Sequence, residues 1–316
     1  MATTAPPYSA APDIVRRALE GRRISPVDVT VSTLLLLALL TSLGVLVTLL
    51  VDVVNEGWPV LSTRLIDFVS SPLSARPETA GLVQGLIGSL ILIGFVVVLA
   101  FPIGVAAAVY LEEYAKDTPL NRLLVSNVRN LAGVPSIVYG LLGLAVFVKA
   151  LGGVTNGRTL ISGGLTLTVL VLPIIVITTS EALRAVPRGI REASFGVGAT
   201  GWETIRHHVI PVSFPAILTG SVLAIARAFG ESAPLLLAGA VLSNFFSAPA
   251  GTSFVSQVTE QSYTALPIII YNWARQPQQE FVALSAAGIV VLLVSLLLVN
   301  TAAIIARDRI ERRQIS

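Results

Sequence analysis

The feature that most constrains this chain is a series of long stretches without a charged side chain. They lie at residues 29–51, 79–111, 130–148, 159–180, 207–226, 232–259 and 281–306. A helix needs about 20 apolar residues to cross a hydrocarbon layer of ~30 Å, whereas a barrel strand needs only about 10. Only 12% of the residues are charged and 54% are hydrophobic, while soluble domains carry about 25% charged residues. The sequence therefore predicts an all-α integral membrane protein and excludes a soluble globular enzyme.

Six transmembrane helices fit these stretches. We expect them at residues 31–51, 82–110, 131–150, 160–180, 212–240 and 281–305. The apolar stretch 241–259 is broken by asparagine, proline, glycine and serine, so it is interpreted as a loop or a re-entrant element. The predicted organisation is an N-terminal tail (1–28), a transmembrane domain (29–306) and a C-terminal tail (307–316).

The basic residues orient these helices, because cytoplasmic loops carry an excess of lysine and arginine. If the N-terminus is inside, fifteen of the 21 basic residues lie inside: Arg16, Arg17, Arg22, Arg23, Lys116, Arg122, Arg129, Arg184, Arg188, Arg191, Arg206, Arg307, Arg309, Arg312 and Arg313. The outer face then holds Arg64, Arg76, Lys149, Arg158 and Arg275. Both termini are therefore expected in the cytoplasm. The net charge of +3 reflects membrane topology and does not imply a nucleic-acid partner.

Catalytic and metal-binding patterns are missing from the sequence. Cysteine is absent, and the two histidines, His207 and His208, are neighbours that point in different directions on a helix. No phosphate-binding G-x-x-x-x-G-K-[ST] loop is present. We therefore expect no metal site, no bound cofactor and no ATP hydrolysis by this chain, so that a pump built from it takes its energy from a partner or from an ion gradient.

Two charged residues lie inside the fifth predicted helix, where a charge costs several kcal/mol unless it is paired or hydrated. Arg227 and Glu231 are four residues apart, on the same helical face. One interpretation is a self-neutralising ion pair that fixes helix packing. The other is an anion site, because a guanidinium offers a planar set of donors to a tetrahedral oxyanion. The carboxylate would then accept the O–H of a protonated oxyanion.

The loop at 181–210 carries the second candidate site. Pro187 suits a helix start, and residues 188–195 form a short amphipathic stretch. Thr200 and Glu203 have the spacing of a capping box, which predicts a second short helix from about Gly201. This loop is interpreted either as a helix lying on lipid headgroups or as a docking helix for a cytoplasmic partner.

The same loop resembles that of the permease subunits of binding-protein-dependent ABC importers. That family carries the pattern E-A-A, three residues, Gly, nine residues, I-x-L-P. The matching positions are Glu192, Ala193, Ser194, Gly198 and Pro211, and the departures are Ser194 for alanine, His208 for isoleucine and Ile210 for leucine. The resemblance implies that Glu192, Ala193, Ser194 and Gly198 contact an ATPase, which binds the ATP and Mg²⁺.

Within that family, two segments resemble phosphate permeases of the PstA type: LAGVPSIVYGLLG at 131–143 and ARAFGESAPLLLAGA at 226–240. The resemblance implies a type I importer (MetI-like) fold with its core at 80–306 and an extra first helix. It implies that Arg227 and Glu231 line the substrate pathway in the bacterial cell membrane. It also implies a pathway or packing helix that carries Gly133, Pro135, Ser136, Tyr139 and Gly140.

The partners that the resemblance implies are a PstC-like permease, two copies of a PstB-like ATPase and an extracytoplasmic phosphate-binding protein. Two other functions stay open at this point. One is an ABC permease for another oxyanion, such as sulfate, molybdate or phosphonate. The other is a secondary transporter or channel that uses Arg227 and Glu231 as a charged gate. An inverted repeat would favour a secondary transporter, and none is visible in the sequence.

Overall fold

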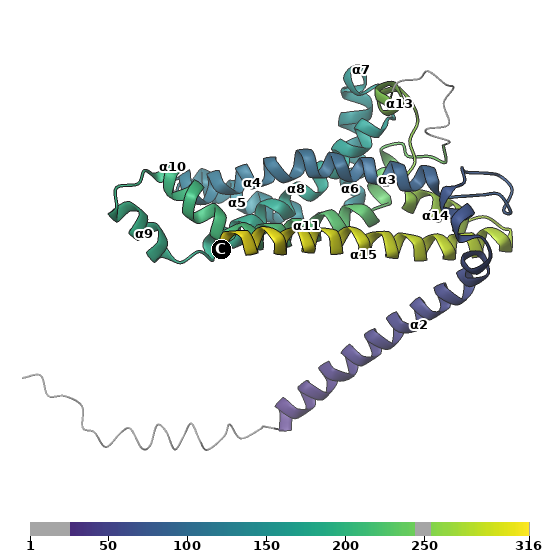
Figure 1. Cartoon of the computed structure of the whole chain (residues 1–316), viewed down its shortest axis with the longest axis horizontal. Coiled ribbons are helices and arrows are strands. Elements are labelled where there is room, and N and C mark those ends of the chain that lie inside the picture. Colours follow the sequence, from purple (N-terminus) through teal and green to yellow (C-terminus); the bar gives the residue numbers. More distant parts are fainter. Residues whose placement is uncertain (1–25, 244–253, 316) are drawn as a thin grey trace, which may run out of the picture. The chain divides into compact units, whose positions relative to one another are not determined.

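The computed structural model describes residues 26–243 and 254–315, and those residues form helices and connecting loops without a strand (Figure 1). The chain divides into two units, Met1–Asp52 and Val53–Ser316. The described part of the first unit is the beginning of helix α2 (Pro26–Ser70). All packing considered below lies within the second unit. Most of the loop or re-entrant element expected at 241–259 falls outside the described residues.

The helices of the second unit follow in a simple order. After α2 come α3 (Val83–Phe95), η2 (Val96–Ala100), α4 (Phe101–Val109), η3 (Tyr110–Tyr114), α5 (Pro119–Ala132), α6 (Ser136–Gly143), η4 (Leu144–Ala150), α7 (Gly152–Thr155), α8 (Leu160–Arg184), α9 (Arg188–Gly196), α10 (Gly201–Thr204), η5 (Ile205–Val209), α11 (Ile210–Gly230), α12 (Ala233–Leu237), α13 (Phe254–Glu260), α14 (Leu266–Ala274) and α15 (Gln279–Ile315). The elements labelled η are π-helical turns, and each of these four continues a neighbouring α-helix.

Five helices among the described residues are long and apolar enough to cross a membrane. They are Pro26–Ser70, Val83–Tyr114, Leu160–Arg184, Gly201–Gly230 and Gln279–Arg309. A sixth candidate is the pair Pro119–Ala132 and Ser136–Ala150, which is bent by 103° at its break. The six predicted helices therefore agree with the fold when this pair is counted as one.

The bent pair corrects the third predicted helix, which was expected to run straight through 131–150. α5 ends at Ala132, and α6 begins only at Ser136. Pro135 explains the break, because proline disfavours a helical conformation in the residue before it and donates no backbone hydrogen bond. α5 itself was missed because it is amphipathic and contains Arg122 and Arg129, so it is not a charge-free stretch.

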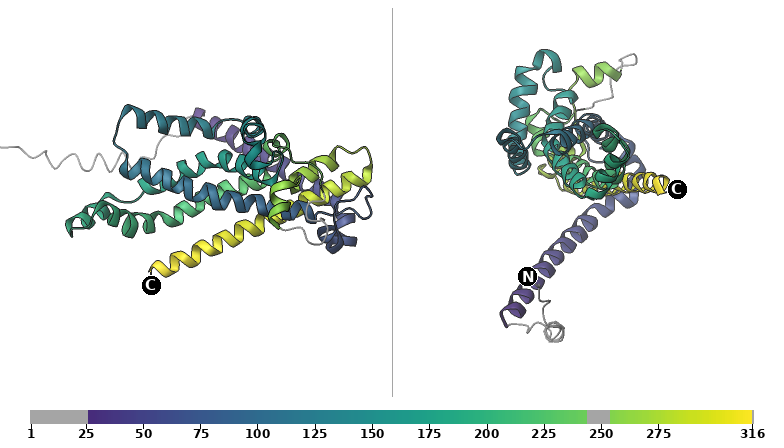
Figure 2. Two further views of the ribbon diagram at one scale, coloured as in Figure 1. Left: turned by 90° about the horizontal axis from the view of Figure 1, so that it is seen from above. Right: turned by 90° about the vertical axis from the view of Figure 1, so that its left-hand side faces the viewer.

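The long helices of the second unit run side by side (Figure 1). α8 packs against α4, α6 and α11, and α11 packs against α15. The loop helices α9 and α10 lie at one end of this bundle and α14 lies at the other, as the view from above in Figure 2 also shows. Buried apolar residues form a central cluster around α8 and one further cluster toward each end. The bundle therefore connects the α9–α10 end to the α14 end through a continuous series of packed helices.

Glycines in α3 allow the chain to pack closely against the start of α14 and the residues just before it. A Cβ atom on Gly88 would overlap the carbonyl oxygen of Thr264. A Cβ on Gly85 would stand 3.1 Å from the Cα of Leu266. Both neighbours are backbone atoms, which cannot move aside as a flexible side chain can. This small-residue face of the second membrane helix therefore packs within the chain.

We expect Gly88→Ala to destabilise the folded protein, whereas Gly94→Ala should not. Overpacking of a tight contact costs about 1–3 kcal/mol. Gly94 lies on the same helix, and a Cβ there meets nothing within 4 Å. Alanine at that position should stabilise the helix by up to about 1 kcal/mol. Thermal unfolding of both variants in the same detergent checks this, and equal midpoints for the two variants would contradict the proposed packing.

Candidate functional site

The first candidate site lies where helix α11 ends. The fifth predicted membrane helix was expected to continue to residue 240, but α11 stops at Gly230. Glu231 follows in an extended conformation (φ −77°, ψ 117°), and α12 begins at Ala233 with Pro234 in its first turn. Glycine and proline account for this interruption, because one weakens a helix and the other cannot continue it. The break places two ionisable side chains beside backbone that is not helical.

The packing of α11 against α8 gives the depth of Arg227 in the bundle. The two helices run in opposite directions, and a Cβ on Gly220 would overlap the side chain of Thr178. Arg227 lies seven residues beyond Gly220 and therefore stands level with about residue 171 of α8, since both helices rise about 1.5 Å per residue. That level is close to the middle of α8 (Leu160–Arg184).

Arg227 and Glu231 form an ion pair that leaves part of the guanidinium available. Arg227 Nε donates to Glu231 Oε1 at 3.2 Å. The Arg227 side chain is 43% exposed and that of Glu231 is 17% exposed. Within the described part of the chain, the two terminal nitrogens of Arg227 make no hydrogen bond. The pair is thus charge-balanced, yet it presents two N–H-bearing nitrogens and a carboxylate to a ligand.

The bend between α5 and α6 lies next to this break. A Cβ on Gly140 would stand 2.7 Å from the Cα of Pro234, so the glycine allows α12 to approach α6. The hydroxyl of Tyr139 donates to the carbonyl oxygen of Leu131 at 2.8 Å, which ties α6 back to α5 across the bend. The two sequence segments singled out at 131–143 and 226–240 therefore pack against each other. Of the residues predicted there, Gly133 and Pro135 form the bend and Ser136 begins α6.

The second candidate site is the loop that carries α9 and α10. Pro187 precedes α9, and α10 begins with a complete capping box in which Thr200 Oγ1 accepts from the Glu203 backbone N–H and the Glu203 carboxylate accepts from the Thr200 backbone N–H. Both predicted helices are confirmed. Gly198 joins them with a φ of +88°, a left-handed conformation that glycine adopts without steric cost. The structure corrects one detail, because the helix that returns toward the membrane begins at Gly201 rather than at residue 212, where the fifth membrane helix was expected to start.

The four residues predicted to contact an ATPase do not all face the same way. Glu192 and Ala193 are exposed, whereas Ser194 is buried and its Oγ lies 2.9 Å from Thr204 Oγ1. This hydrogen bond links α9 to α10. Around the exposed residues stand large apolar side chains that face solvent: Phe195, Val197 and Trp202. Exposed apolar groups of this kind are typical of a protein interaction surface.

Comparison with known proteins identifies the class of this chain. Residues 100–316 match the family described as "Binding-protein-dependent transport system inner membrane component". This match takes in more than half of the chain. The chain belongs to this permease family. It is accordingly a multi-pass membrane protein and a transport subunit, and the family works with a separate ATPase and a binding protein.

Two relatives of the permease extend over most of its length. "Probable ABC transporter permease protein YqgI" of Bacillus subtilis (strain 168) is 33% identical over 267 residues, which are 82% of this chain and 88% of the relative. "Phosphate transport system permease protein PstA 1" of Mycobacterium tuberculosis (strain CDC 1551 / Oshkosh) is 34% identical over 272 residues, which are 85% of this chain and 84% of the relative. Both are named as permease proteins, which agrees with a transport subunit that is not itself an enzyme.

Solved structures show that the permease has the expected type I importer fold. A chain of a bacterial alginate ABC transporter, in complex with an alginate pentasaccharide-bound periplasmic protein, has a TM-score of 0.61 at 13% identity and covers 96% of this chain and 98% of its own. A chain of the inward-facing MetNI methionine ABC transporter has a TM-score of 0.56 at 19% identity and covers 72% of this chain and 95% of its own. At these identities the likeness concerns the fold alone.

The permease's departure from the family pattern at His208 has a simple structural account. His208 is exposed on η5, whereas Ile205 and Val209 of the same turn are buried in the cluster beneath the loop. A polar side chain at 208 therefore leaves the packing intact. Sequence reasoning missed a different feature of this end of the permease, namely two ion pairs that join the second membrane helix, through Glu112 and Glu113, to the end of α8 and to α9. Neither carboxylate belongs to a motif, and their partners lie far away in the sequence.

No group of three or more histidine, aspartate or glutamate side chains that could hold a metal ion is found within 26–243 and 254–315.

Proposed function

We propose that this permease is the membrane subunit through which an ATP-driven importer moves inorganic phosphate. The observation that carries the proposal is the position of Arg227. It lies near mid-helix depth, with its terminal nitrogens unbonded within the described chain, where the two segments that resemble phosphate permeases pack together. The relative from Mycobacterium tuberculosis, whose name specifies phosphate transport, supports the same substrate.

The chemistry of the pair suits phosphate. The free nitrogens of Arg227 donate to the oxygens of a tetrahedral oxyanion. The Glu231 carboxylate accepts a hydrogen bond from the O–H of a protonated phosphate and repels an oxyanion that has no proton to donate. Since Arg227 is already paired and is half exposed, its hold on the anion is weak. Weak binding favours transport, because a tightly bound anion would leave slowly.

The proposed assembly contains a PstC-like sister permease, two copies of a PstB-like ATPase and an extracytoplasmic phosphate-binding protein. In it, ATP and Mg²⁺ are bound by the ATPase. The ATPase contacts the face of α9 that presents Glu192 and Ala193. The turn at Gly198 sets the orientation of that face. We place the α9–α10 end and both termini in the cytoplasm, because most basic residues lie at that end or near the termini.

The helix that begins at α10 connects the two candidate sites. It runs without interruption from Gly201 to Gly230, and thirty residues at 1.5 Å each give a length of about 45 Å. Movement of the docking loop is therefore carried along one helix to the break beside Arg227. In the proposed cycle, ATP binding draws the two ATPases together and opens the pathway outward, and hydrolysis returns it toward the cytoplasm.

Phosphate uptake by the reconstituted importer tests this function. We expect ATP-dependent uptake of labelled phosphate into proteoliposomes that contain both permeases, the ATPase and the binding protein. Uptake should stop when the ATPase is left out. Excess sulfate, molybdate or phosphonate should compete poorly. Uptake of one of these anions in place of phosphate would assign another substrate to the same machine, and uptake that persists without the ATPase would favour a secondary transporter or channel.

A further inference from the structure

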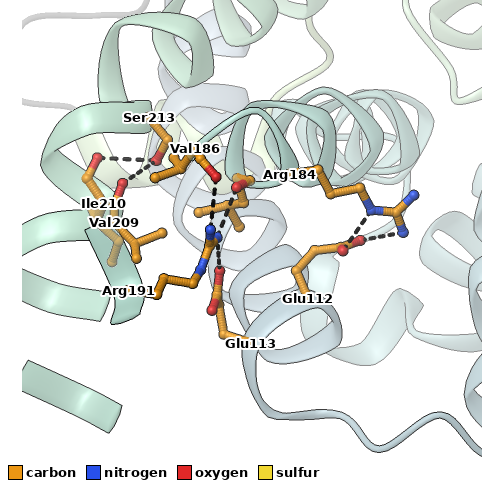
Figure 3. A network of polar contacts seen from close by, with 9 residues as sticks. Glu112, Glu113, Arg184, Val186, Arg191, Val209, Ile210 and Ser213 are labelled. Atoms are coloured by element: carbon orange, nitrogen blue, oxygen red, sulfur yellow. Dashed lines mark hydrogen bonds and ion pairs between the residues drawn. The ribbon is translucent and has the colours of Figure 1, made fainter. Parts of the chain in front are cut away.

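A guanidinium at the α9–α10 end joins three elements, one of which, η3, is far from the other two in the sequence (Figure 3). Arg191 of α9 donates to Glu113 Oε1 of η3 at 2.7 Å. It also donates to the carbonyl oxygen of Leu183 at 3.0 Å, in the last turn of α8, and to that of Val186 at 2.9 Å, in the short connection between α8 and α9. One side chain thus connects the docking helix to the end of the second membrane helix and to the end of α8.

The burial of this contact distinguishes it from a surface ion pair. The Arg191 and Glu113 side chains are 22% and 12% exposed. The ion pair Arg122–Asp117 has the same N···O distance of 2.7 Å, but its side chains are 69% and 79% exposed. Exposed pairs contribute little because water and salt screen them, whereas loss of one partner from a sheltered pair leaves a charge without compensation.

The bond to Leu183 adds a charged donor at the C-terminal end of α8. The last carbonyl oxygens of a helix have no partner within the helix, and they carry the negative end of its dipole. Arg191 supplies both donors and positive charge at this point. Next to it, Arg184 of α8 makes a two-bond ion pair with Glu112, at 2.7 and 2.8 Å. The end of the second membrane helix is therefore bound to α8 directly as well as through Arg191.

A hydrogen bond at Ser194 connects α9 to the helix that follows it, α10. Ser194 lies three residues after Arg191, on the same face of α9, and its hydroxyl is hydrogen-bonded to Thr204 of α10. α10 continues into α11. The inner face of the docking helix is thus attached to α11 through Ser194 and to α8 and the second membrane helix through Arg191.

The geometry points to Arg191 as a positioning residue that makes α9 move together with the ends of α8 and the second membrane helix. This inference rests on the proposed function for the docking role of α9, and goes beyond it by assigning a second route for the movement. Without Arg191, α9 would keep its chain connection to α8 and its link to α11 through Ser194, but it would lose its ion pair with the second membrane helix. Docking and ATP hydrolysis would then continue, but less transport would result from each ATP.

A double-mutant cycle in the complete importer tests this coupling. We expect Arg191→Met and Glu113→Gln each to lower the phosphate taken up per ATP hydrolysed by about tenfold, and the double variant to be no worse than the poorer single one. Pull-down of the ATPase should be unchanged. The exposed pair supplies the matched control, because Arg122→Met and Asp117→Asn should leave uptake per ATP at the unsubstituted level. Arg191→Lys keeps the charge but cannot donate to Glu113 and to the carbonyl oxygens at the same time, so its phosphate uptake per ATP should be intermediate. This variant also tests the inference if Arg191→Met fails to fold.

A distance measurement separates positioning from a general loss of stability and does not depend on the substrate. The chain has no cysteine, so spin labels can be placed at Lys116→Cys and Arg188→Cys alone. We expect a narrow distance distribution that is the same with and without ATP, and a broad, ATP-dependent one after Arg191→Met. A narrow, unchanged distribution in the Arg191→Met variant would overturn the inference, as would unchanged uptake per ATP. If the unsubstituted importer moved no phosphate, the proposed substrate would fail, and the distances would still decide the role of Arg191.

Discussion

Substitution of Gly198 by valine should reduce ATP-driven uptake by about tenfold or more, while the protein still folds. Gly198 has a φ of +88°, and a left-handed conformation costs an ordinary residue roughly 1–2 kcal/mol, more if it is β-branched. A Cβ at this position meets nothing within 4 Å, so the effect comes from the backbone alone. The loop backbone at this position would relax to another conformation, which would rotate α9 away from the ATPase. Uptake in proteoliposomes and pull-down of the ATPase measure both consequences.

Two matched variants make the Gly198 result specific. Asparagine tolerates the left-handed region better than other residues, so Gly198→Asn should keep much of the activity. Gly196 lies two residues earlier, at the end of α9, and a Cβ there also meets nothing within 4 Å. Gly196→Ala should therefore behave like the unsubstituted protein. If Gly198→Val bound and drove the ATPase normally, the docking role of this loop would be wrong.

Substitution of Arg227 by glutamine should lower phosphate uptake by about ten- to hundredfold, because hydrogen bonds to a charged group contribute about 1.5–3 kcal/mol. Folding should be affected less, since the side chain is 43% exposed and has one ion-pair partner, Glu231, among the described residues. Arg227→Lys keeps the charge but loses the planar donor set, so we expect an intermediate rate. Initial rates of labelled phosphate uptake at several external concentrations provide the measurement.

Companion variants distinguish an anion site from a packing pair. Leu223 lies one helical turn before Arg227 and is exposed, so Leu223→Ala is a control for changes of α11 that remove no charge. Glu231→Gln removes the proposed acceptor for the phosphate proton and should reduce the preference for phosphate over sulfate. Normal uptake by both Arg227 variants would return this residue to a role in helix packing, and unchanged selectivity in Glu231→Gln would remove the role proposed for the carboxylate.

The sequence predicted those parts of the fold that depend on local physical chemistry. Charge-free stretches located five membrane helices because each stretch must be buried in lipid as a helix. The capping box at Thr200 and Glu203 was recognised from spacing alone, since both of its hydrogen bonds lie within one turn. The interruption of α11 at Gly230 coincides with a glycine and a nearby proline that were visible in the sequence, although the helix was expected to continue past them.

The parts that were missed depend on contacts between distant residues. α5 was overlooked because its hydrophobicity is confined to one face and its other face carries arginines. The pairing of Arg191 with Glu113 joins residues 78 positions apart, and no local pattern selects one partner over another at that distance. The candidate pathway residues were found because a charge inside an apolar stretch is conspicuous. Their surroundings required the packing of α6 on α12 to be known.

The packing of α6 on α12 has a consequence for how the sequences of such permeases diverge. A side chain at position 140 would meet the backbone of Pro234 at 2.7 Å and the side chain of Leu237 at 3.0 Å. Backbone cannot shrink, and a smaller residue at position 237 would leave the contact with Pro234 in place. A homologous chain that enlarges residue 140 must therefore displace the segment that follows Glu231. We expect residue 140 to stay small in relatives whose α6 and α12 pack as they do here.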